Sequence, residues 1–75
     1  MAIYKDDVKE LAKLGASVGV DAGYYDLATA KQVAAIVKST GAQLVIENAG
    51  RYSSDDLKEL VKLAGGRILL LGLSK

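Results

Sequence analysis

Residues 53–71 read SSDDLKELVKLAGGRILLL, and residues 29–47, which lie 24 positions earlier, read TAKQVAAIVKSTGAQLVIE. The apolar residues of the two segments coincide: Val33 with Leu57, Ile36 with Leu60, Val37 with Val61, Leu44 with Ile68 and Ile46 with Leu70. Internal similarity at a period of roughly 20 to 50 residues is typical of repeat architectures. The two segments therefore predict a repeated unit that consists of a helix, a glycine stop and a strand.

The helical part of each unit is indicated by apolar or small residues spaced three and four apart. These are Val8, Leu11, Ala12 and Gly15; Val33, Ile36, Val37 and Thr40; and Leu57, Leu60, Val61 and Ala64. Thr29 and Ser53 stand three residues before Gln32 and Asp56, a spacing typical of an N-cap followed by a side chain that reaches back. Glycine follows each helix, at Gly15, Gly41 and Gly65–Gly66, where a left-handed residue ends a helix without steric cost.

Short apolar runs follow the glycines and predict strands: SVGV at 17–20, QLVI at 43–46 and RILLLGL at 67–73. Strands that alternate with helices pair in parallel through right-handed crossovers. The fold class is thus predicted to be α/β: one domain, residues 1–75, with units of about 2–23, 24–50 and 51–75 that form a three-stranded parallel sheet with helices packed on it. Two arrangements remain open, a solenoid-like order with all helices on one face and a flavodoxin-like order with helices on both.

Alternation along the strands divides their residues between two faces of the sheet. Val18, Val20, Leu44, Ile46, Ile68 and Leu70 share one face, whereas Gly19, Asp21, Val45, Glu47, Leu69, Leu71 and Leu73 share the other. In a one-sided arrangement the second face exposes Val45, Leu69, Leu71 and Leu73, although parallel sheets are almost always covered on both faces. We expect a second copy to cover these four residues in a homodimer; the alternative is that one of the chain's own helices crosses to that face.

Length and composition favour the same expectation. A chain of 75 residues has a marginal core, and without Cys or His it has neither disulfides nor ordinary zinc, haem or iron–sulfur sites. Oligomerisation or very regular packing is then the remaining source of stability. With 51% hydrophobic residues, 25% charged residues and a net charge of +1, it has the composition of a folded soluble domain. We expect a cytoplasmic protein with no membrane segment, no cofactor and no bound metal. Pro, Trp and Phe are also missing, which leaves an engineered origin open.

The ends of the predicted strands supply the candidate ligand site. Ligands of open parallel sheets bind beyond the carboxyl ends of the strands, where this chain has Asp21, Glu47 and Asn48, followed by Tyr24, Tyr25, Arg51 and Tyr52. Two carboxylates near one another could hold a hard cation such as Mg²⁺. The same residue types are common in solvated turns. A nucleotide is weakly indicated, because Gly23 and Gly50 follow strands singly and no G-K-[ST] comes after them.

Catalysis and nucleic-acid binding have less support. The chain lacks His and Cys and has no G-x-S-x-G segment, so it is not expected to be an enzyme. Lys13, Lys38 and Lys62 occupy one repeat position, but acidic residues share the helix surfaces and nucleic acid is not a favoured partner. We expect a non-enzymatic protein–protein interaction or self-assembly module. The alternative is a domain that binds a small molecule or metal ion at the strand ends.

Overall fold

The polypeptide alternates between helices and strands. The computed structural model describes residues 5–73. In chain order its elements are α1 (Lys5–Lys13), β1 (Val18–Asp21), α2 (Leu27–Thr40), β2 (Leu44–Glu47), the 3₁₀ turn η1 (Ala49–Arg51), α3 (Ser54–Leu63) and β3 (Ile68–Leu70). The α/β class, with three helices and three strands among the described residues, is confirmed.

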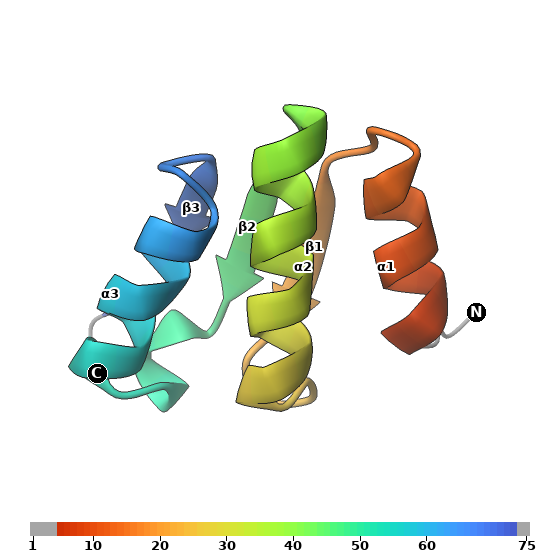
Figure 1. Cartoon of the computed structure of the whole chain (residues 1–75). Helices are drawn as coiled ribbons and strands as arrows, with labels where there is room; N and C mark the ends of the chain where they lie inside the picture. The colour runs from red at the N-terminus through yellow and green to blue at the C-terminus, as the bar shows by residue number, and fades with distance from the viewer. Residues whose placement is uncertain (1–4, 74–75) are drawn as a thin grey trace.

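The strands form one parallel sheet in the order β1-β2-β3. Val18 pairs with Leu44, and Leu44 in turn pairs with Ile68. All three helices lie over the same face of this sheet (Figure 1), because each right-handed crossover leads to the adjacent strand in the same direction. The structure therefore has the one-sided order, and the flavodoxin-like alternative is wrong.

The hydrophobic core lies between the helices and the sheet face beneath them. Val20, Leu44 and Ile46 are fully buried there, together with Val33 of α2 and Leu60 of α3. Partly buried residues pack around this centre and include Val18, Ile68 and Leu70. The six strand residues that alternation assigns to one face thus all contribute to the core, as predicted.

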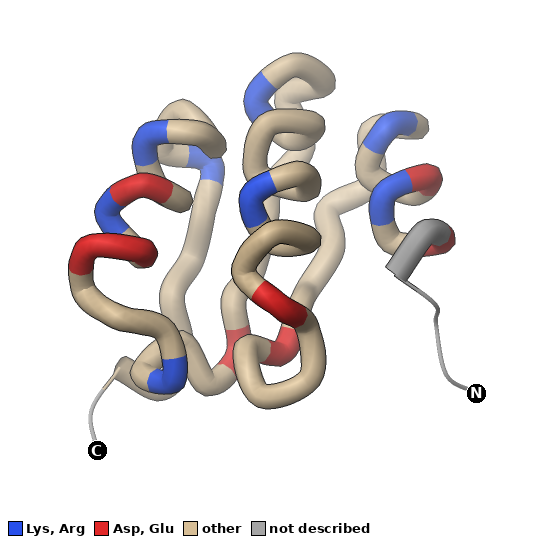
Figure 2. Tube along the Cα trace, turned by 60° about the horizontal axis from the view of Figure 1, so that its bottom comes forward, with Lys and Arg blue, Asp and Glu red and all other residues tan. Residues whose placement is uncertain are grey.

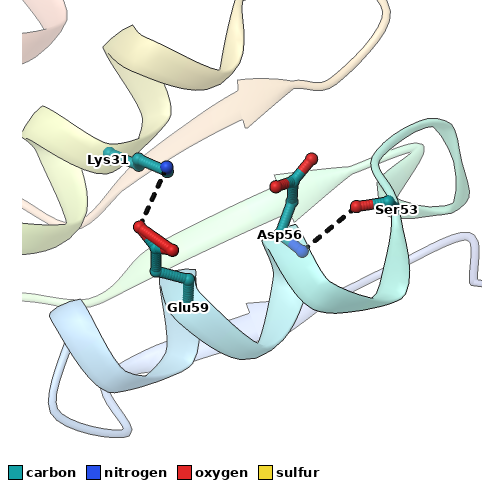
Figure 3. Close-up of polar contacts among 4 residues, drawn as sticks. All are labelled: Lys31, Ser53, Asp56 and Glu59. Atoms are coloured by element: carbon teal, nitrogen blue, oxygen red, sulfur yellow. Dashed lines mark hydrogen bonds and ion pairs between the residues drawn. The ribbon is translucent and has the colours of Figure 1, made fainter.

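The helix starts agree with the prediction at α3 and differ from it at α2. Ser53 is the N-cap of α3, and its hydroxyl accepts a hydrogen bond from the Asp56 backbone N–H at 3.2 Å (Figure 3). Thr29, by contrast, lies inside α2, whose N-cap is Asp26. The Thr29 hydroxyl donates to the Asp26 carboxylate instead. The Thr29 prediction was wrong because an aspartate three residues earlier is at least as good an N-cap.

Contacts between helices fix the spacing of the helical layer. Lys9 of α1 donates to the Gln32 side chain of α2 at 3.0 Å. Lys31 of α2 forms an ion pair with Glu59 of α3 at 2.9 Å (Figure 3), and this contact raises the pKa of Lys31.

The carboxyl end of α2 lies at Gly41, the glycine that the sequence predicts as its stop. Gly41 adopts φ 79° and donates its N–H to the Val37 carbonyl.

Candidate functional site

The strand ends bring together several residues of the predicted ligand site. Asp21 ends β1 and Glu47 ends β2, and the two are register partners on neighbouring strands. Asn48 follows immediately and adopts a left-handed conformation, φ 56°, from which the 3₁₀ turn η1 begins. That turn places Arg51 next to the loop that follows β1, where it lies against Gly23.

Asp21 is already occupied by contacts within the chain. Its Oδ1 accepts a hydrogen bond from the Gly23 N–H at 2.8 Å and another from the Asn48 side-chain amide at 3.0 Å. The pKa of the Asp21 carboxyl is lowered chiefly by the hydrogen bond from Asn48. The hydrogen bond from Gly23 and the positive charge of Arg51 lower this pKa further. Asp21 therefore links the two strand-end loops as a carboxylate.

The tyrosines form a second link between the same loops. The Tyr52 hydroxyl donates to the backbone carbonyl of Tyr25 at 2.8 Å. Burial is the main cause that raises the pKa of Tyr52, and the negative charges of Asp26 and Asp21 add to it. Tyr25 is buried and meets Tyr24 edge to face at 5.1 Å between ring centroids, whereas Tyr24 is exposed. Of the tyrosines in the predicted site, Tyr24 is thus the one most open to solvent.

The Glu47 side chain lies against β1. A Cβ atom on Gly19 would lie 3.5 Å from the Glu47 Oε1, so this carboxylate leans over Gly19 on the outer face of the sheet. Within residues 5–73, no group of three or more His, Cys, Asp or Glu side chains is placed to hold a metal ion. The contacts that the strand-end residues make are with one another, and they join the loops that follow β1 and β2.

The outer face of the sheet carries the second set of predicted site residues. Leu69, Leu71 and Leu73 are 48%, 45% and 52% exposed, and Val45 is half-buried beside Leu69. No helix among the described residues lies on this side (Figure 1). The alternative in which one of the chain's own helices crosses over is therefore wrong. We refer to Val45, Leu69, Leu71 and Leu73 as the outer face.

Backbone contacts that sequence reasoning missed hold the last part of the outer face in place. Ala49 donates its N–H to the Leu71 carbonyl at 2.8 Å, and Gly50 donates to the Gly72 carbonyl at 3.1 Å. A Cβ on Gly50 would lie 3.0 Å from that same Gly72 oxygen. The single glycine after a strand, which resembles a weak phosphate-loop signal in the sequence, allows two backbones to approach closely.

Blue and red segments alternate on α1 and α3, whereas α2 carries only basic charges and is preceded by its acidic N-cap Asp26 (Figure 2). Lys13, Lys38 and Lys62 each lie in the last turn of their helix, where positive charge is favourable to the helix dipole. Asp55 and Asp56 occupy the first turn of α3 for the complementary reason. That nucleic acid is a disfavoured partner stays a prediction from the mixed charges.

Comparison of the chain with protein-family models, with curated proteins and with solved structures gave no significant match. Within the part of the chain that the structure describes, no helix is long and apolar enough to cross a membrane.

Proposed function

We propose that this domain is a non-enzymatic self-assembly module whose copies associate through the outer face. One observation carries the proposal: Leu69, Leu71 and Leu73, three neighbouring leucines on one side of a parallel sheet, remain about half exposed. Parallel sheets are almost always covered on both faces. A contiguous apolar patch of this kind marks an interaction site.

A second copy of the chain is the partner that best fits the patch. Asp21 and Glu47 share this side of the sheet, in the row that ends β1 and β2, whereas Val45 and Leu69 lie in a row without charge. The net charge of the chain is only +1, so two copies can meet at the uncharged row with limited repulsion. Both copies would offer the same surface, as in the isologous dimers that are the commonest oligomers. A back-to-back arrangement would give each sheet a helical layer on one side and another sheet on the other.

The expected affinity is modest. Burying the exposed half of one leucine contributes about 1 kcal/mol. The three leucines of each copy, six in a pair, would together contribute roughly 6 kcal/mol. Association itself costs roughly 4 to 15 kcal/mol in lost freedom of motion. The leucines alone therefore do not give micromolar association, which needs about 8 kcal/mol net, and we expect a weak, transient contact that forms only toward millimolar concentrations.

We also propose that the three helix–strand units are repeats of about 24 residues. The repeat is supported by the strand register, in which Val18 pairs with Leu44, 26 positions later, and Leu44 pairs with Ile68, 24 positions later. The units at 24–50 and 51–75 would then contribute the apolar residues of the outer face.

Sedimentation velocity over the micromolar to millimolar range tests the proposal. Leu71→Glu places a charge in the middle of the outer face and should abolish the association of the wild-type chain through this surface. Ala35→Glu is the matched control, because it adds the same charge to an exposed position of α2 on the opposite side of the molecule. If Leu71→Glu and Ala35→Glu associate equally well, the outer face is not the interface.

Ligand binding at the strand ends stays a prediction. A cation at Asp21 would have to compete with Asn48 and Gly23, which already use the same oxygen. We therefore place self-assembly first and a small-molecule or metal-ion site second.

A further inference from the structure

The sheet has two open edges, each with the flank of a helix beside it. A further copy of the chain set against either edge would repeat the arrangement of strands and helices found inside the molecule. Among the described residues, β1 and β3 each pair with β2 alone. We propose that copies of this chain also associate end to end, with the β3 edge and α3 flank of one copy against the β1 edge and α1 flank of the next. This contact is separate from the outer face and does not depend on it.

The backbone of each edge has the alternation that such a contact requires. Val18 and Ala22 donate to Gln43 and Glu47, so the even-numbered residues of this segment face β2 and Gly19 faces the open edge. At the other end, Leu71 donates to Ile46, so odd-numbered residues face β2. The peptide groups of Ile68 and Leu70 therefore point away from it.

The next copy would bring its β1 beside this β3 in the register already used inside the molecule. Within the chain, Val18 pairs with Leu44 and Leu44 with Ile68, all three on the helix-covered face. Ile68 against Val18 of a second copy would extend that row by one strand. The inward and outward faces would then stay matched across the junction.

Apolar residues on the two helix flanks match as well. Lys9 of α1 reaches toward α2. Successive residues are turned by roughly 100° around a helix, which places Leu11 and Leu14 at least about 140° from Lys9. These two leucines therefore lie on the outer flank of α1. They are 40% and 83% exposed. In α3, Glu59 reaches toward α2, which puts Val61 on that helix's outer flank, where it is also exposed.

Charges on the flanks are complementary in sign. Asp7 shares the outer flank of α1 with Leu11, and Lys58 shares the outer flank of α3 with Val61. Lys58 stands in α3 where Lys9 stands in α1, and Lys9 hydrogen-bonds across the α1–α2 contact to Gln32. In an end-to-end contact, Lys58 of one copy would meet Asp7 of the next in the same way.

A contact between two different surfaces of the same chain is heterologous and is not limited to two copies. Copies joined in this manner form an open array, or a ring where the rotation closes, whose mass grows with concentration, whereas the outer face alone gives a pair. The array would also line up the outer faces of its members into one longer apolar surface.

Charge reversal at the two flanks tests this inference by sedimentation velocity in the Val45→Lys background, where a charge on the central strand β2 removes outer-face association and no residue of the β3–β1 junction is changed. In that background Lys58→Glu or Asp7→Lys places like charges in the junction and should weaken end-to-end association roughly tenfold, because attraction becomes repulsion. An equimolar mixture of the two variants should restore it, since every junction between alternating copies again pairs one acidic with one basic side chain. Lys38→Glu, in the middle helix, is the control and should leave association unchanged.

Far-UV circular dichroism verifies that every variant is folded. The inference is overturned if the average mass of the Val45→Lys chain does not grow with concentration, if either reversal alone assembles as well as the Val45→Lys parent, or if the mixture fails to recover. Loss of the outer-face pair in Val45→Lys, together with continued growth of arrays, would support both interfaces independently.

Discussion

Gly72 holds the end of the outer face against the loop after β2, and replacing it should destabilise the fold in a measurable way. Gly72 has φ 72°, and a Cβ there would lie 3.2 Å from the Asn48 Cα. Gly66 also has a positive φ, 81°, but a Cβ there meets nothing within 4 Å. The two glycines therefore separate the cost of the left-handed backbone from the cost of a close approach.

The left-handed conformation costs a non-glycine residue roughly 1 to 2 kcal/mol, and the stiffer unfolded chain lowers the net loss by roughly 0.4 to 1 kcal/mol. Gly66→Ala should therefore lose about 1 kcal/mol. Gly72→Ala must also push apart the backbones of Asn48 and Gly72, which strains the Ala49–Leu71 and Gly50–Gly72 hydrogen bonds. At about 1 kcal/mol for each such bond, the total loss should reach about 2 to 3 kcal/mol.

Urea denaturation at low micromolar protein, below the range of association, measures the two losses. In a domain of this size each kcal/mol also corresponds to roughly 4 to 8 °C in Tm. Equal losses in Gly72→Ala and Gly66→Ala would refute the reasoning, because they would show that the approach of Gly72 to Asn48 places no constraint on residue size.

Other parts of the fold give further predictions. Leu60→Ala empties a fully buried position and should cost roughly 2 to 5 kcal/mol in urea denaturation; a loss below 1 kcal/mol would mean that Leu60 is not in the core. Ser53→Ala removes the acceptor for the Asp56 N–H and should cost about 1 kcal/mol, whereas Ser54→Ala, one residue later, should cost little. The pKa of Asp21 is lowered in the folded state, so its contribution to stability is complete above the unfolded pKa and disappears as pH falls through the folded one. The Tm difference between wild type and Asp21→Asn should thus be constant above about pH 5 and narrow below about pH 4, and a difference that widens in acid would contradict this.

The sequence predicts much of the architecture because the determinants are local. Alternation in "QLVIE" places Leu44 and Ile46 under the helices, and glycine at position 41 ends α2 where a left-handed residue is needed. The exposure of Leu69 and Leu71 follows from the same alternation in "RILLLGL" once the helices are known to share one side, whereas Leu73 comes after Gly72, whose left-handed backbone interrupts the alternation. Strand order itself depends on how the helices pack, and the sequence leaves it open.

Other features depend on contacts between segments distant in the chain and could not be predicted. The Tyr52 hydroxyl meets the Tyr25 carbonyl, and Gly50 meets Gly72, only because β1, β2 and β3 end side by side. The apolar spacing of α1 indicates a buried face that includes Leu11, yet Leu11 is 40% exposed. Among residues 5–73, α1 is the terminal helix of the layer and has no neighbour on its outer flank, so periodicity alone overstates the burial of that side.

The most direct test of the central claim asks which surface becomes buried on association. The chain has no cysteine, so Leu69→Cys and Ala35→Cys each introduce one unique thiol, on the outer face and on the exposed side of α2. The rate of maleimide modification is measured as protein concentration rises through the association midpoint found by sedimentation. We predict that the thiol at position 69 becomes protected while the thiol at position 35 reacts at a constant rate; an unprotected position 69 in the associated protein would contradict the proposal.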